Sequence, residues 1–124
     1  MTELIGGPVY VTHFPLMEIP FYHAKEDGGD VDLALNADLI LPGYREVAGS
    51  GARIASQSIL EHKAKLFNLP MDDYSPYVAL RALPQYKQTA GFGLGWQRYT
   101  QWILKLPTIW DATLTPRGSC IPFP

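Results

Sequence analysis

The residues with the clearest chemical potential are three glycines at alternate positions, Gly91, Gly93 and Gly95, followed by Arg98. Large apolar side chains separate the glycines, and such alternation is typical of a strand and not of a phosphate-binding loop. A strand face without side chains lets a flat ligand lie directly on the backbone, and Arg98 would stand beside it. The same glycines would also allow close packing of a neighbouring strand or helix, so the pattern alone leaves both interpretations open.

Glu46 and Arg53 are further candidates, because each stands beside a stretch with almost no side chains. The carboxylate of Glu46 could hold Mg²⁺ near phosphates, or it could simply face solvent. Arg53 could bind a carboxylate or carboxamide oxygen, or form an ordinary surface ion pair. Their odd separation would place them on opposite faces of a regular strand. The glycine-rich segment 49–51 can supply a bulge that would bring them to one face.

The remaining reactive side chains do not form a site by their spacing. His13, His23 and His62 lack the spacing of metal ligands. Arg81 falls in an expected helix, where pairing with an acid or reaching toward solvent is the more ordinary role. Cys120 is the only cysteine, which excludes an internal disulfide and a multi-cysteine metal site and fits a reducing compartment.

The composition bounds the class of protein. With 124 residues, 47% hydrophobic and 18% charged, the chain is expected to form a single domain over residues 1–124. Its net charge of −2 gives no electrostatic support for non-specific nucleic-acid binding. The sequence shows no secretory signal and no apolar stretch of about 18 residues, so we expect no membrane partner and a cytoplasmic location.

The elements that must position these residues begin with short β-rich runs. These runs predict strands at 8–14, 21–24, 33–41 and 45–53. Turn residues such as Pro42 and Gly43 separate them, and connections this short favour antiparallel pairing.

Helical spacing of apolar residues follows. It predicts one helix over 56–67, capped by Ser56 or Ser58, and a second that opens at 70–73 and stops at Pro84. The glycine strand comes next, and apolar residues at spacings of three and four predict another helix past Arg98. The order of elements predicts an α+β fold with an antiparallel sheet flanked by helices.

Taken together, the residues resemble the C-terminal half of a class II aminoacyl-tRNA synthetase core. The resemblance is to the asparaginyl/aspartyl subgroup, which includes asparagine-synthetase-like paralogues. It covers nearly the whole chain, and residues 91–98 resemble the motif 3 of that family. The other matching segments are 7–15, 20–22, 38–43, 46–47 with Gly49 and Arg53, and Asp111 with Pro116 and Arg117.

The resemblance implies a role for each candidate residue. Arg98 would stack on the adenine of ATP and reach toward the γ-phosphate, and Glu46 would hold Mg²⁺ between phosphates. Both would then be catalytic, and Arg53 would bind the side chain of aspartate or asparagine. The implied ATP-binding residues are Gly91, Gly93, Gly95 and Arg98. The implied activity is ATP-dependent adenylation of an amino-acid carboxylate.

Four positions depart from the family pattern. Ile19 stands where a basic residue is usual, and Thr89 stands where a histidine is usual. Gln97 replaces an acidic residue before the arginine of motif 3, and Ala52 replaces a glutamine before Arg53. These departures leave the substrate open, so aspartate, asparagine and related amino acids all remain candidate substrates.

Motifs 1 and 2 and an anticodon-binding domain are expected to lie upstream of Met1. We therefore expect a component of a split or partnered ligase, in a homo- or hetero-oligomer with a chain that supplies motifs 1 and 2. Two alternatives remain open: a free-standing paralogue acting on small molecules, and a non-catalytic binding or regulatory module. Direct tRNA binding by this acidic chain is not expected.

Overall fold

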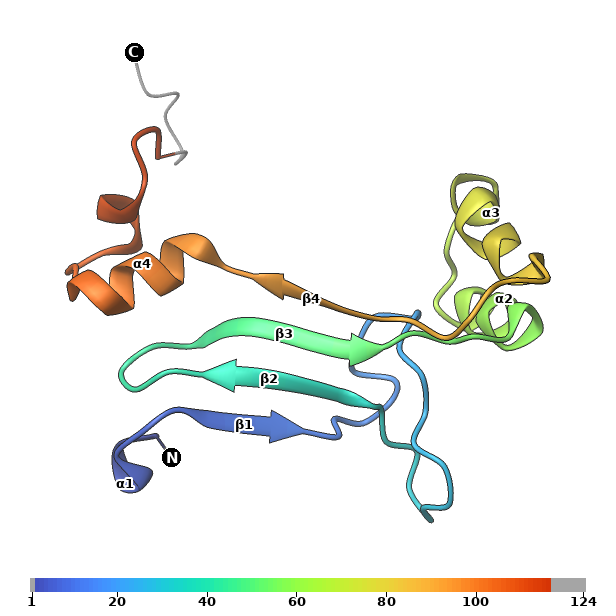
Figure 1. Cartoon of the computed structure of the whole chain (residues 1–124), viewed down its shortest axis with the longest axis horizontal. Coiled ribbons are helices and arrows are strands. Elements are labelled where there is room, and N and C mark those ends of the chain that lie inside the picture. Colours follow the sequence, from blue (N-terminus) through green and yellow to red (C-terminus); the bar gives the residue numbers. More distant parts are fainter. Residues whose placement is uncertain (1, 117–124) are drawn as a thin grey trace. The chain divides into compact units, whose positions relative to one another are not determined.

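The computed structural model describes residues 2–116, so Arg117 and Cys120 of the sequence analysis lie outside the described residues. Within this range the chain forms a four-stranded sheet in the order β1-β2-β3-β4, and helices precede or follow its strands along the chain (Figure 1). The strands are β1 Val9–Thr12, β2 Asn36–Ile40, β3 Glu46–Ala52 and β4 Ala90–Leu94. The helices are α1 Thr2–Ile5, α2 Gln57–Leu66, α3 Met71–Ala79 and α4 Trp96–Leu104. The predicted α+β fold with an antiparallel sheet is confirmed.

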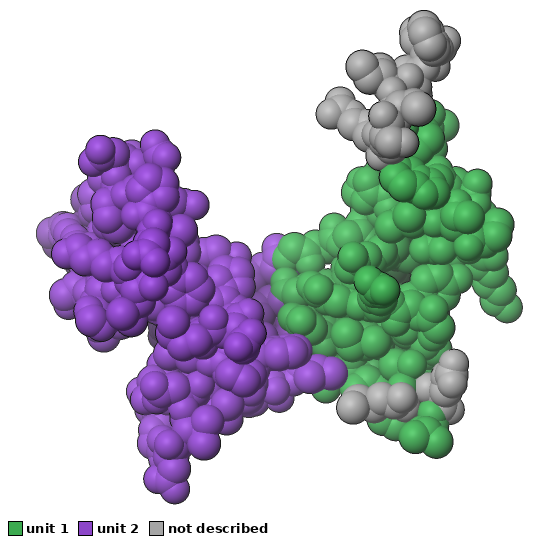
Figure 2. Space-filling model, turned by 180° about the vertical axis from the view of Figure 1, so that it is seen from behind, with its two compact units in different colours: residues 1–10, 38–49, 93–124 green, residues 11–37, 50–92 purple. Residues whose placement is uncertain are grey.

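Backbone contacts divide the chain into two compact units (Figure 2). Unit 1 comprises Met1–Tyr10, Asp38–Gly49 and Gly93–Pro124, and unit 2 comprises Val11–Ala37 and Ser50–Phe92. Each unit is described by itself below. The expectation of a single domain stays a prediction.

Unit 2 contains the main apolar core. Leu60 and Ala64 on α2 are fully buried, and they pack with Phe21, Ile54 and Val78. The helix α2 begins as expected, because the Ser56 hydroxyl accepts a hydrogen bond from the backbone N–H of Ile59 at 3.4 Å. Ile54 belongs to this core and Ala52 packs against it, so the core fixes the backbone on both sides of Arg53.

Unit 1 holds the start of α4 beside the first residues of β3. The backbone N–H of Gly95 donates to the carbonyl of Val47 at 2.8 Å, which continues the strand pairing. The carbonyl of Gly95 accepts from the N–H of Tyr99 at 3.0 Å, which starts the helix. One residue thus ends the sheet and begins α4.

The observed strands are shorter than predicted, and two further differences from the sequence prediction have a clear local cause. The helix after the glycine strand begins at Trp96 and not past Arg98, because Gly95 already serves as its N-cap. The expected strand at 21–24 is reduced to an isolated antiparallel bridge between His23 and Arg53. Its neighbour Pro20 has no N–H to donate, and it accepts a hydrogen bond from His23 in a local turn instead.

Among the helices of residues 2–116, none has the length and apolar character needed to cross a bilayer.

Candidate functional site

Arg98 lies in the first turn of α4 and is held over the start of that helix. Its Nη1 donates a hydrogen bond to the backbone carbonyl of Glu46. The aliphatic stem of Arg98 passes beside Gly95, since a Cβ built there would lie 3.8 Å from Arg98 Cδ. No carboxylate within the described range pairs with this guanidinium, so its other N–H groups remain available to a ligand.

The glycines of unit 1 leave the backbone beside Arg98 bare. A Cβ built on Gly93 would meet nothing within 4 Å, and one on Gly95 would lie 3.5 Å from the carbonyl oxygen of Val47. Neither glycine is therefore needed for close packing of the described chain at that face. This favours the ligand interpretation over the packing interpretation for these two positions.

Two carboxylates converge at Gly49. A Cβ on Gly49 would lie 2.6 Å from Glu46 Oε1 and 3.2 Å from Asp38 Oδ1, so both acids stand over the same glycine. Burial raises the pKa of Asp38 above its usual value, and a cation bound nearby would oppose this effect by stabilising the ionised form. A carboxylate pair of this kind fits Mg²⁺, which commonly takes one or two protein carboxylates together with phosphate oxygens.

Asp38 is the acid that sequence reasoning missed as a ligand. It lies in a segment that resembles the family, but no pattern in the sequence brings it close to Glu46. The pairing of β2 with β3 places Asp38 beside Gly49, whereas Glu46 reaches the same point from the start of β3. In the part of the chain that the structure describes, no group of three or more potential metal ligands occurs.

The predicted bulge at 49–51 does not show in the pairing of β3 with β4. Val47 bonds to Gly95 and Arg53 bonds to Thr89, and equal numbers of residues separate these bonds on the two strands. One regular register fits both bonds. Glu46 approaches Gly49 without a bulge, because its exposed side chain lies at the very start of the strand.

Arg53 belongs to unit 2 and lies over the ring of Tyr22, with its guanidinium carbon 4.1 Å from the ring centroid. Its Nη2 would be 2.9 Å from a Cβ on Gly91, so this glycine makes room for the guanidinium. Within residues 2–116 no acid pairs with Arg53. Arg53 also borders a hollow of about 700 Å³ with four tyrosines, which are Tyr22, Tyr74, Tyr77 and Tyr86.

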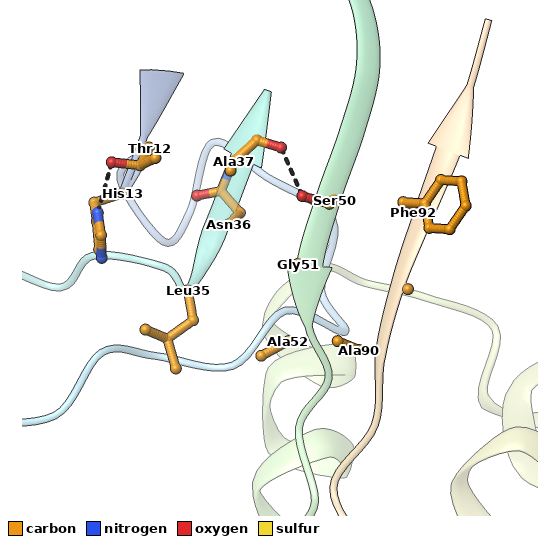
Figure 3. Close-up of a pocket in the computed structure, with 11 residues that line it drawn as sticks. Thr12, His13, Leu35, Asn36, Ala37, Ser50, Gly51, Ala52, Ala90 and Phe92 are labelled. Atoms are coloured by element: carbon orange, nitrogen blue, oxygen red, sulfur yellow. Dashed lines mark hydrogen bonds between the residues drawn. The ribbon is translucent and has the colours of Figure 1, made fainter. Parts of the chain in front are cut away.

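A second hollow of unit 2, of about 550 Å³, is almost entirely apolar (Figure 3). Its lining includes Ser50, Ala52, Ala90 and Phe92. Along the strands these residues alternate with Gly51 and Gly91, which lie under His23 and Arg53. By this alternation it lies on the other face of the strands. The Ser50 hydroxyl donates to the carbonyl of Ala37 at 3.0 Å, and the other polar side chains of the lining are Thr12, His13 and Asn36.

The structure thus brings the predicted residues together in two groups. Unit 1 contains Glu46, Gly93, Gly95 and Arg98, and unit 2 contains Arg53 and Gly91. Asp38 joins the first group. His23, which the sequence analysis considered only as a metal ligand, joins the second as the bridge partner of Arg53.

The sequence model for "tRNA synthetases class II (D, K and N)" matches residues 1–119. The chain belongs to this family. Similar proteins include the asparagine–tRNA ligase of Desulforamulus reducens, 35% identical over 94% of this chain and 27% of that protein. The asparagine–tRNA ligase of Thermus thermophilus is 36% identical over 94% of this chain and 26% of its own length.

Solved structures of the family agree. The chain matches Entamoeba histolytica asparaginyl-tRNA synthetase with a TM-score of 0.86 and 34% identity, covering 98% of this chain and 28% of that one. It matches Pyrococcus horikoshii asparaginyl-tRNA synthetase, complexed with asparaginyl-adenylate, with a TM-score of 0.88 and 28% identity, covering 99% and 28%. The chain therefore spans about a quarter of the length of the relatives it matches.

Proposed function

We propose that this chain is a component of an ATP-dependent adenylate-forming ligase. It would activate the carboxylate of asparagine, aspartate or a related amino acid. The observation that carries the proposal is the anchoring of Arg98 on the Glu46 carbonyl, beside bare glycines and a pair of carboxylates. In a member of the class II synthetase family, this arrangement suits a nucleotide with its metal ion.

The nucleotide would lie on the glycine face of unit 1. The guanidinium of Arg98 can stack on the adenine ring and direct its remaining N–H groups at phosphate oxygens. Asp38 and Glu46 would hold Mg²⁺, which when bound neutralises charge on the phosphates. Because Arg98 is already fixed by its hydrogen bond to the backbone, little side-chain freedom is lost when ATP binds.

The amino acid would be bound by its side chain at Arg53. One oxygen of its α-carboxylate would attack the α-phosphorus of ATP and form a mixed anhydride, the aminoacyl-adenylate. The bond from the α-phosphorus to the bridging oxygen would break, and pyrophosphate would leave. Arg53 holds the substrate and takes no part in these bond changes.

A partner would complete the site. An arginine of motif 2 would bind the α-phosphate, and each missing contact to a transferring phosphate typically costs about 3 kcal/mol in the transition state. We propose that another polypeptide, or another copy of this chain in an oligomer, supplies motifs 1 and 2. The net charge of −2 argues against direct binding of tRNA by this chain.

Pyrophosphate exchange into ATP, with asparagine or aspartate, tests the proposal. We expect exchange in a complex with a co-purifying partner, and a loss of at least about a hundredfold in Arg98→Ala. Lys65→Ala removes an exposed positive charge from α2 and serves as the matched control. Mg·ATP binding that Arg98→Ala leaves unchanged would refute the nucleotide site. Arg98-dependent binding without exchange in any complex would favour the non-catalytic module.

A further inference from the structure

His23 and Arg53 stand directly opposite each other in an antiparallel bridge of unit 2. The backbone bonds on either side of this pair, at 2.9 and 3.0 Å, join the neighbouring residues and not His23 and Arg53 themselves. This is the pattern of a non-hydrogen-bonded pair, in which opposite side chains approach most closely. The two side chains therefore leave the ladder on the same face and close together.

A pair of glycines makes room for both side chains. The bond from the Arg53 N–H to the Thr89 carbonyl, 2.8 Å, sets the register in which Gly51 opposes Gly91. A Cβ on Gly51 would lie 2.5 Å from His23 Nε2, and a Cβ on Gly91 would lie 2.9 Å from Arg53 Nη2. The imidazole and the guanidinium thus lie next to each other over adjacent glycines.

The hydrogen bond of His23 determines which ring nitrogen carries the proton. Nδ1 lies 3.2 Å from the carbonyl oxygen of Pro20, and a carbonyl can only accept, so Nδ1 is the protonated nitrogen. Burial lowers the pKa of His23, and the charges of Arg53 and Lys63 lower it further against the opposing effect of the Pro20 hydrogen bond. The ring is then neutral near pH 7, and Nε2 carries a lone pair.

Nε2 has no partner among the described residues. Nothing there is hydrogen-bonded to it, and no fully buried polar side-chain atom of these residues lacks a partner, so Nε2 keeps some exposure although His23 as a whole is only 8% exposed. Beside it, Arg53 presents N–H groups without an acidic partner. The site therefore sets a hydrogen-bond acceptor next to a donor.

We propose that His23 and Arg53 together recognise the side chain of the substrate and prefer a carboxamide to a carboxylate. A carboxamide offers an oxygen to Arg53 and an N–H to Nε2 of His23, so both groups are satisfied. A carboxylate offers two acceptors, and its second oxygen would face the lone pair of Nε2. This inference rests on the proposed function, in which Arg53 binds the substrate side chain.

Binding of L-asparagine and L-aspartate, measured by calorimetry on the full chain or on its complex with a partner, tests the inference. Wild type is expected to prefer asparagine, and His23→Phe, which keeps a ring over Gly51 without an acceptor, should lower the preference about fivefold or more. Arg53→Ala should abolish binding of both. An unchanged preference in His23→Phe, or a preference of wild type for aspartate, overturns the inference.

A change in the ligand gives a second test that needs no variant. The side chain of aspartate β-methyl ester is neutral like that of asparagine but has no N–H group to donate. Because its side chain lacks the carboxamide N–H, the ester should bind to wild type about fivefold more weakly than asparagine. Equal affinities would overturn the role of Nε2. If nucleotide binding depends on Arg98 but no amino acid binds through Arg53, both this inference and the substrate part of the proposed function fail. If amino acids bind through Arg53 but the preference for asparagine does not change in His23→Phe, only this inference fails.

Discussion

The carboxylate pair at Gly49 gives the sharpest prediction, in the variant Gly49→Ala. The new Cβ would stand 2.6 Å from Glu46 Oε1 and 3.2 Å from Asp38 Oδ1. Carbon atoms make favourable contacts at about 3.5–4.0 Å, so the Glu46 carboxylate must retreat by roughly 1 Å. Magnesium tolerates little change in the position of its ligands. The substitution should therefore disturb the metal site directly.

The effect of Gly49→Ala on stability should be much smaller than its effect on metal affinity. Glu46 is exposed and can swing away, and Gly49 has no left-handed backbone angle, so the free energy of unfolding should change by less than about 0.5 kcal/mol. Displacing a metal ligand or its support commonly costs about tenfold in metal affinity. We therefore expect weaker metal-dependent binding in a protein of unchanged stability.

The assay compares the affinity for ATP with Mg²⁺ to the affinity with a chelator. The ratio of these affinities should fall about tenfold in Gly49→Ala. Gly93→Ala is the matched control, because its Cβ would meet nothing within 4 Å. A methyl group there would affect ATP on the glycine face with or without the metal, so the ratio should stay as in wild type.

A stable Gly49→Ala variant that keeps the full effect of Mg²⁺ would refute the reasoning. It would show that Asp38 and Glu46 do not hold the metal, even though they converge at this glycine. A fall in the ratio for Gly93→Ala of the same size would also count against it, because the effect would then come from the nucleotide and not from the carboxylates.

Further predictions concern stability. Leu60→Ala removes a fully buried side chain of the unit 2 core and should lower the free energy of unfolding by about 2–5 kcal/mol, whereas the exposed Leu66→Ala on the same helix should cost less than about 1 kcal/mol in denaturant titrations. Burial lowers the pKa of Lys63 from 10.5 to about 8. Between these two pH values the unfolded state binds more protons than the folded state. The free energy of unfolding should therefore rise with pH, by on the order of 3 kcal/mol from pH 8 to pH 10.5. Lys63→Met should remove this rise, and parallel pH profiles for wild type and variant would contradict it.

Local sequence patterns predicted much of the fold. The alternating glycines identify β4, and the apolar spacing and Ser56 identify α2, because periodicity and capping depend on near neighbours. Boundaries were less accurate where one residue serves two elements. Gly95 both pairs with β3 and starts α4, so the helix begins earlier than its apolar spacing indicates.

The family, the fold class and the candidates Glu46, Arg53 and Arg98 follow from motifs that are contiguous in the chain. The approach of Asp38 and Glu46 at Gly49, and the position of His23 beside Arg53, follow only from the folded chain. Both of these side-chain arrangements depend on strand pairing between segments that are separated in sequence. A shift of one residue in either pairing would turn those side chains to the other face, and no local pattern specifies that register.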